Sequence, residues 1–304
     1  MPQVEPSGQM LGARVTGLDL SRPLSGDDFA LIVRSLGAYG VLCFPHQNLD
    51  SSALKAFSAR FGTLEVNVAA SLYASDVPEV MVLSNMVEHG RPVGLPDAGQ
   101  DWHTDMSYSK TIAFATVLHA SRIPRRNGHA LGNTEFLNMH AAFAELPEEL
   151  KRRLQHATAT HDFNKFWEMM RRERGSNRPP LTAEQRRQKP PVSHPIFLRH
   201  PVTGRLVLYA NPGYAVHIDG LPEAESKELL YMLFEHQLNA KYRYAHEWSE
   251  GDVLMWDNIG TIHRAVADYT PEEHRLMKRC QVIADRVFAA DGLDSHEPAA
   301  PAPR

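Results

Sequence analysis

Residues 252–263 read Asp-Val-Leu-Met-Trp-Asp-Asn-Ile-Gly-Thr-Ile-His, and this stretch decides the fold class. Two short apolar segments, at 252–256 and 259–263, are separated by the turn-forming pair Asp257-Asn258. Runs of four to eight apolar residues, bounded by turn residues, are typical of buried β-strands. The stretch therefore predicts two neighbouring strands and not a helix.

The rest of the chain follows the same pattern. Helices are expected over 28–36 with Ser25 as N-cap, after Asp50 or Ser51, and over 139–154 and 222–238. Many short strands with a few helices outside them favour a mainly β fold with flanking helices, built on a sandwich or jelly-roll core. The further strands are expected at 11–20, 41–44, 80–83, 112–118, 192–198, 205–209, 242–248 and 275–284.

Length and composition indicate an ordinary globular enzyme-sized chain. The 304 residues are expected to form one domain over 1–289, with a disordered Ala/Pro-rich tail at 290–304. The net charge of −4 argues against a nucleic-acid or anionic-membrane partner. Two cysteines without CxxC spacing indicate neither a disulfide framework nor a thiolate metal site, and no signal or membrane-spanning segment is visible, so a cytoplasmic location is expected.

One stretch is strongly basic. Between Lys151 and Pro190 there are eleven Lys and Arg against four Asp and Glu. The polar, proline-containing part of it, residues 164–191, is expected to be a mobile, lid-like insert. The simpler interpretation of its basic residues is that they form the solvated face of a helix and loop, and the alternative is that they help to capture a ligand.

A search for metal ligands begins with His-x-Asp. In an extended segment, residues two apart point to the same side, so His103 and Asp105 can bind one ion together. The pair alone is weak evidence, because a second one occurs at His217 and Asp219. That second pair precedes Gly220-Leu221-Pro222 at an expected helix start, where Asp219 has an ordinary turn or capping role.

A third ligand is expected at His263, which follows the strand and turn described above. Two His and one carboxylate leave one face of the metal open, as a non-haem iron(II) oxygenase requires. Arg275, on a late apolar strand, strengthens the case, because a buried guanidinium needs an anion. A structural Asp or Glu is the alternative partner.

The ordered series of motifs resembles the taurine dioxygenase and 2,4-D dioxygenase family of iron(II)/2-oxoglutarate-dependent enzymes, over most of the chain. The motifs are 11–13, 19–24, Phe61-Gly62, Trp102-His103-Thr104-Asp105, Gly132-Asn133-Thr134, 200–204, Trp256-Asp257-Asn258 with His263, and 275–279.

The resemblance implies a double-stranded β-helix, cupin-like core, with His103, Asp105 and His263 as iron ligands and catalytic centre. Arg275 and Thr134 would hold the distal carboxylate of 2-oxoglutarate, which reacts with O2 to give succinate and CO2. A small organic substrate would be hydroxylated. The family also forms homodimers and higher homo-oligomers.

Two positions concern the substrate. Where taurine enzymes place a His after the Phe-Gly pair, this chain has Asn67, and Gly99 replaces the family's substrate-contacting Asn, so taurine is not the expected substrate. Strand alternation from Arg275 puts Met277 and Arg279 on the same inner face. Two guanidinium groups in one cavity need two anions, so Arg279 is expected to bind an anionic substrate, a sulfonate or carboxylate.

Two other classes use similar residues. A zinc hydrolase can bind its metal through two His and a carboxylate, but it needs no dicarboxylate cradle at Arg275 and Thr134 and is indifferent to oxygen. A binding protein on the same scaffold would keep the ligands without releasing succinate.

Overall fold

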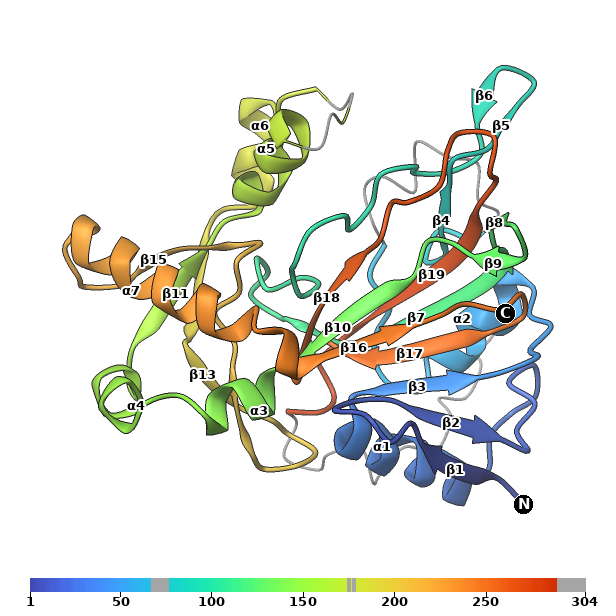
Figure 1. Cartoon of the computed structure of the whole chain (residues 1–304), viewed down its shortest axis with the longest axis horizontal. Helices are drawn as coiled ribbons and strands as arrows, with labels where there is room; N and C mark the ends of the chain where they lie inside the picture. The colour runs from blue at the N-terminus through green and yellow to red at the C-terminus, as the bar shows by residue number, and fades with distance from the viewer. Residues whose placement is uncertain (67–76, 174–175, 177–178, 289–304) are drawn as a thin grey trace, which may run out of the picture.

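The computed structural model describes residues 1–66, 77–173, 176 and 179–288. Asn67 and the tail expected at 290–304 lie outside these residues. A seven-stranded sheet, antiparallel except for the β2–β3 pair, is the largest element (Figure 1). Its strands in spatial order are β1 (Gln3–Pro6), β2 (Ala13–Thr16), β3 (Val41–Phe44), β17 (Val253–Asp257), β7 (Ala113–Arg122), β19 (Leu276–Ile283) and β4 (Met81–Ser84).

A second sheet covers one face of the first. It orders β16 (Arg243–His246), β10 (Thr134–Asn138) and β18 (Thr261–Ala265), all antiparallel. Side chains from both sheets, such as Phe136, Trp256 and Met277, form one buried cluster between them. The stretch at 252–263 thus supplies a strand to each sheet, which is why it positions residues at their junction.

Helices α1 (Gly26–Tyr39) and α2 (Ser51–Ser58) cover the other face of the large sheet (Figure 1). The strand β3 shows how alternation serves both layers: Val41 packs between the sheets, whereas Leu42 and Phe44 pack toward the helices. Ser25 caps α1, as expected, by accepting a hydrogen bond from the Asp28 backbone N–H at 3.1 Å.

The remaining elements form a second lobe beside the two sheets (Figure 1). Within the described residues it contains a three-stranded sheet, one hairpin and five α-helices, and two small hairpins lie outside it. The bounds are β12 (Val192–Pro195), β11 (Thr158–His161), β15 (Ala215–Ile218), β13 (Phe197–Arg199), β14 (Leu206–Leu208), α3 (Met139–Ala144), α4 (Glu148–Leu154), α5 (Phe163–Glu173), α6 (Ala183–Gln188), α7 (Glu223–Gln237), a 3-10 turn (Ala240–Tyr242), and the hairpins β5 (Val87–Glu88) with β6 (Arg91–Pro92) and β8 (Arg125–Arg126) with β9 (His129–Ala130).

Several expected elements have different bounds. The helix expected over 139–154 is two helices, because Pro147 interrupts it between α3 and α4. The helix expected to end at Gly37 continues to Tyr39 and ends at Gly40, whose φ of 69° suits a C-cap glycine. Sequence patterns missed β10, β11 and β15. Within the described residues, no helix is both long and apolar enough to cross a bilayer.

Candidate active site

A backbone bridge holds two histidines opposite each other. His103 lies before β7, and His263 is the middle residue of β18. The His103 N–H donates to the His263 carbonyl at 3.0 Å, and the His263 N–H donates to the His103 carbonyl at 2.7 Å. Asp105 brings its carboxylate to both rings: Oδ1 is 3.6 Å from His103 Nε2, and Oδ2 is 3.9 Å from His263 Nε2.

These three side chains are suited to a metal ion. One ligand atom of each lies within 4.8 Å of the other two, and the residues are only 3 to 5% exposed. The His103 Nδ1 lies 2.7 Å from the Asp101 carbonyl and therefore carries the proton, which leaves the lone pair on Nε2, facing Asp105. An ion with open positions fits this set of donors.

Protonation at the cluster also favours a metal. Burial, together with the neighbouring His103, lowers the pKa of His263 to about 3, so its ring is neutral near pH 7. Burial alone would raise the pKa of Asp105, but Arg279 and the two histidines hold it well below its usual range. Two neutral imidazoles and one carboxylate are the protonation states in which these residues ligate metals.

A chain of hydrogen bonds orients the Asp105 carboxylate. Thr116 Oγ1 donates to Asp105 Oδ2 at 2.7 Å and accepts from Asn258 Nδ2 at 2.9 Å. Asn258 in turn accepts at Oδ1 from Trp256 Nε1 at 3.0 Å. All of these residues are buried. Trp256 and Asn258 belong to a motif noted in the sequence, whereas nothing in the sequence singled out Thr116.

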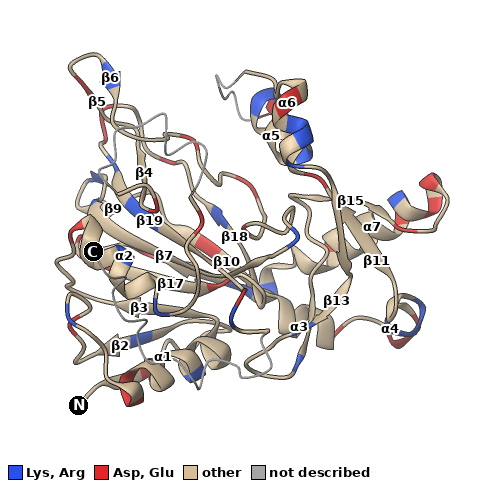
Figure 2. Cartoon of the chain, turned by 180° about the vertical axis from the view of Figure 1, so that it is seen from behind, with Lys and Arg blue, Asp and Glu red and all other residues tan. Residues whose placement is uncertain are grey.

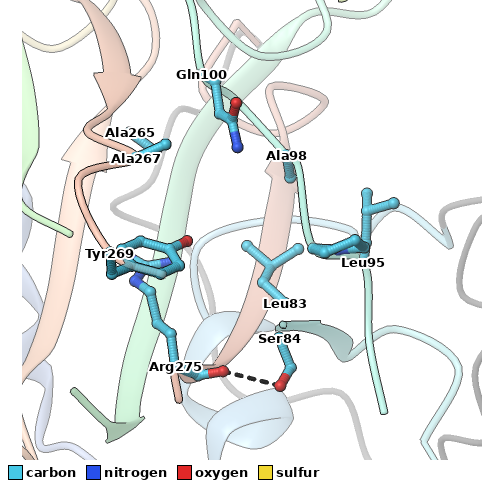
Figure 3. A pocket seen from close by; sticks show the side chains of 10 residues that line it. Leu83, Ser84, Leu95, Ala98, Gln100, Ala265, Ala267, Tyr269 and Arg275 are labelled. Atoms are coloured by element: carbon cyan, nitrogen blue, oxygen red, sulfur yellow. Dashed lines mark hydrogen bonds between the residues drawn. The ribbon is translucent and has the colours of Figure 1, made fainter. Parts of the chain in front are cut away.

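Arg275 occupies a separate pocket, in which its guanidinium lies beside Tyr269 (Figure 3). The residue is 6% exposed, and its Nε has no hydrogen-bond partner among the described residues. Nη2 donates a long hydrogen bond, 3.4 Å, to the Gly132 carbonyl. Tyr269 is a second hydrogen-bond neighbour of the guanidinium, and its ring centroid lies 6.0 Å from the guanidinium carbon. Burial lowers the pKa of Arg275. No ion pair to a carboxylate is found for it in the described part of the chain.

Thr134 lies next to this pocket. It pairs in register with Ala265, which lines the pocket, and follows Gly132 by two residues. Its Oγ1 accepts a hydrogen bond from Trp248 Nε1 at 3.1 Å, so the hydroxyl proton is free to be donated. Arg275 and Thr134 together can hold a carboxylate.

Arg279 lies outside the Arg275 pocket, beside the cluster of His103, Asp105 and His263. Its Nη1 is 3.7 Å from Asp105 Oδ1, and its Nη2 is 3.3 Å from the Met81 sulfur. Met277 packs between the sheets and Cys280 toward the helices, as the expected alternation requires. The Nε of Arg279 has no hydrogen-bond partner among the described residues.

Aromatic side chains complete the pocket, and the sequence did not predict them. The ring centroids of His103 and Phe166 are 4.8 Å apart. Three of these aromatics come from the basic segment, where residues 163, 166, 167 and 170 recur at helical spacing. That pattern could have identified α5 in the sequence. The pocket is lined by Met81, Leu95, Ala98, Gly99, His103, Asp105, Tyr108, Phe163, Phe166, Trp167, Tyr214, Arg279 and Gln281.

The competing His-x-Asp pair does not join the cluster. His217 lies on β15 and faces Glu223, with 3.4 Å between its Nδ1 and the carboxylate. Asp219 accepts hydrogen bonds from Thr158 Oγ1 at 2.5 Å and Thr160 Oγ1 at 2.6 Å, so it ties β11 to the turn after β15. Asn67, expected at the substrate site, lies outside the described residues.

A buried site of two histidines and one carboxylate, with a second pocket around an unpaired arginine, defines a non-haem metal oxygenase that takes an acidic co-substrate. Comparisons with known proteins agree. Residues 3–281 match the model of the taurine catabolism dioxygenase TauD, TfdA family. The chain belongs to this family, and it is a 2-oxoglutarate-dependent dioxygenase that uses Fe(II), 2-oxoglutarate and O2.

Individual relatives cover nearly the whole chain. Pentalenolactone F synthase from Streptomyces avermitilis is 32% identical over 289 residues, which are 91% of this chain and 92% of that protein. The alpha-ketoglutarate-dependent 2,4-dichlorophenoxyacetate dioxygenase from Burkholderia sp. (strain RASC) is 32% identical over 283 residues, covering 90% and 91%. The crystal structure of AAD-2 in complex with Mn(II) and N-oxalylglycine matches with a TM-score of 0.75 at 26% identity, covering 93% of this chain and 97% of that one.

Proposed function

We propose that this enzyme hydroxylates a small organic acid with an apolar body. The observation that carries the proposal is a single pocket lined by two of the metal-binding residues, His103 and Asp105, by the partly unpaired guanidinium of Arg279 and by an aromatic wall. His103, Asp105 and His263 hold Fe(II) on one side of that pocket. Bound there with 2-oxoglutarate and O2, the iron supplies the oxidation, and 2-oxoglutarate leaves as succinate and CO2.

Arg275 and Thr134 bind the distal carboxylate of 2-oxoglutarate. Support comes from the guanidinium, which is buried without a carboxylate partner in the described residues. A bound carboxylate neutralises this charge and satisfies Nε, while Thr134 adds a hydroxyl donor. A monocarboxylate without the second acid group would leave the arginine unpaired.

Arg279 binds the acidic group of the substrate. Asp105 is a nearby protein anion, but 3.7 Å is longer than a strong charge-assisted hydrogen bond, and a metal ion draws on the same carboxylate. Arg279 therefore keeps donors for an anion in the pocket. Its second effect is to keep Asp105 ionised and ready to bind the metal.

The aromatic wall selects the apolar body of the substrate and excludes water. Tyr214 packs against both Tyr108 and Phe166, with ring centroids 4.8 and 5.3 Å away, respectively. Gly99 leaves room beside His103, because a Cβ there would lie 3.3 Å from His103 Cε1. An aryl or alicyclic carboxylate fits such a pocket, and the name of the 2,4-dichlorophenoxyacetate enzyme describes an aromatic acid of this kind.

The segment 164–191 acts as a lid on this pocket. Its helix α5 supplies Phe166 and Trp167 to the lining, and Lys189 lies 5.0 Å from the Tyr108 ring centroid. Several basic residues lie along α5 and α6 (Figure 2). Arg172 and Arg187 are exposed and pair with glutamates one turn away. The basic residues of this segment thus belong to a solvated helical face, whereas the apolar side of α5 lines the pocket and contacts the substrate.

The two facing sheets are the jelly-roll, double-stranded β-helix core of one domain over 1–289. A cytoplasmic location and a homodimer or higher homo-oligomer stay predictions.

The test compares matched acids and amides. Wild-type enzyme and Arg279→Met receive aryl and alicyclic carboxylates, sulfonates and the corresponding neutral amides, and substrate-dependent succinate is measured. We expect wild type to prefer the acid by at least tenfold in kcat/KM, and Arg279→Met to lose that preference. A wild type that prefers the amide, or a variant equally impaired on both, would refute the anionic substrate.

A further inference from the structure

A second cluster of metal-type ligands lies between the two facing sheets. Cys43 comes from β3, His246 from β16, and Asp252 immediately precedes β17. One ligand atom of each lies within 4.8 Å of the other two. The cluster shares no residue with the proposed iron site.

His246 has a nitrogen that the protein leaves without a partner. The His246 side chain is 9% exposed, and its Nε2 has no hydrogen-bond partner among the described residues. Nε2 lies 3.3 Å from Asp252 Oδ2, but in a geometry that is not a hydrogen bond; Asp252 Oδ2 accepts instead from the Ser249 backbone N–H at 2.9 Å. An unsatisfied buried nitrogen next to a carboxylate oxygen suggests an electrophile between them.

The sulfur supplies the third ligand. Cys43 is partly buried and packs against the cluster between the sheets. A divalent cation that binds here would displace the thiol proton, because metal coordination deprotonates thiols outright. One thiolate, one carboxylate and one neutral imidazole then balance a charge of +2.

We propose that Cys43, His246 and Asp252 form a second metal site, selective for Zn²⁺ or Co²⁺. Thiolate and imidazole ligands favour these ions, whereas the oxygen-rich sites of Mg²⁺ and Ca²⁺ contain no sulfur. Ligand atoms around tetrahedral zinc lie about 3.3 to 3.8 Å apart, given bond lengths near 2.0 and 2.3 Å. The cluster therefore closes on the ion by side-chain shifts of about 1 Å, and solvent completes the coordination.

The position of the site gives it a structural role. The ring centroids of His246 and Trp248 are 4.8 Å apart, and Trp248 Nε1 donates a hydrogen bond to Thr134 Oγ1. A metal here links β3 and β17 of the large sheet to β16 of the small one. The second site therefore fixes the two sheets to each other next to Trp248, the hydrogen-bond partner of Thr134.

The test is Co²⁺ titration of the full-length, metal-free, reduced protein under argon. The site at His103, Asp105 and His263 contains no sulfur, so a thiolate-to-cobalt charge-transfer band in the near ultraviolet reports a cysteine ligand. We expect a band that saturates by two equivalents of Co²⁺, because the site at His103, Asp105 and His263 binds the other equivalent. The band should be absent in Cys43→Ser and weakened at least tenfold in affinity in His246→Gln. The matched control Cys280→Ser removes the other cysteine and should keep the band.

A second measurement needs no variant. Zn²⁺ should slow alkylation of Cys43 by iodoacetamide at least tenfold in wild type, as read from the mass of the Cys43 peptide. A wild type without the charge-transfer band, a band that survives in Cys43→Ser or is undiminished in His246→Gln, or an alkylation rate unchanged by Zn²⁺ would each overturn the proposal.

Discussion

Replacing Arg275 with Met should separate co-substrate binding from stability. Met keeps much of the apolar volume but removes the guanidinium of a residue that is 6% exposed, whose hydrogen-bond neighbours include the Gly132 carbonyl, at 3.4 Å, and Tyr269. Loss of a buried, charge-assisted clamp on a carboxylate costs about 2 to 5 kcal/mol. Since each 1.4 kcal/mol is a factor of ten, the Kd for 2-oxoglutarate should rise by about 30-fold to several thousand-fold.

The same change should not destabilise the protein without ligands. An unpaired buried charge is unfavourable, and apolar replacements of buried charges are often neutral or stabilising. The thermal midpoint of Arg275→Met without metal or 2-oxoglutarate should therefore equal or exceed that of wild type.

Anaerobic calorimetric titration of 2-oxoglutarate into the Mn²⁺-loaded protein measures the affinity, and a melting curve of the metal-free protein measures stability. Arg279→Met is the matched control and should leave 2-oxoglutarate affinity within a few-fold. The reasoning fails if Arg275→Met binds 2-oxoglutarate as wild type does, or if it melts several degrees lower, since either result would make Arg275 a structural residue.

Three further predictions follow from other contacts. Thr116→Val removes the donor to Asp105 and should weaken Mn²⁺ binding about 10- to 100-fold in an equilibrium titration, whereas Thr160→Val, which loses a similar bond to Asp219, should not. Burial lowers the pKa of both His161 and His263 to about 3, so the unfolded chain binds more protons than the folded one below pH 6.5. These two residues should lower the free energy of unfolding of the metal-free protein by about 2.5 kcal/mol between pH 7 and pH 5.5, and urea curves of equal midpoint would contradict this. Limited proteolysis within 171–187 should slow when 2-oxoglutarate, metal and substrate are bound, and equal rates would leave that segment a static surface.

The sequence was informative wherever local chemistry determines structure. Ser25 and Asp50 cap helices as expected, because their side-chain oxygens accept hydrogen bonds from the free backbone N–H three residues further along the chain. Strand spacing offered two candidate pairs, at His103 and Asp105 and at His217 and Asp219, and the ordered motifs selected the first. In the structure His103 lies in an isolated bridge and Asp105 in a turn. Adding His263 needed a residue about 160 positions away, and only the ordered motifs made that contact visible.

The sequence was uninformative where burial depends on distant partners. The strands β11 and β15 carry polar residues such as Thr158 and Thr160, whose hydroxyls are satisfied by Asp219, so period-two hydrophobicity is weak there. The basic residues of α5 concealed an apolar face. Thr116 gave no signal because its role depends on three-dimensional contacts with Asp105 and Asn258.

The most direct test of the central claim is succinate formation under matched metal-ligand substitution. Wild type, His103→Ala, Asp105→Ala, His263→Ala and His217→Ala are supplied with Fe²⁺, 2-oxoglutarate, O2 and the best acid from the substrate panel. We predict oxygen-dependent succinate from wild type and His217→Ala, and at least a hundredfold loss from each of the other three. Full activity in His103→Ala with loss in His217→Ala, or succinate release independent of O2, would contradict it.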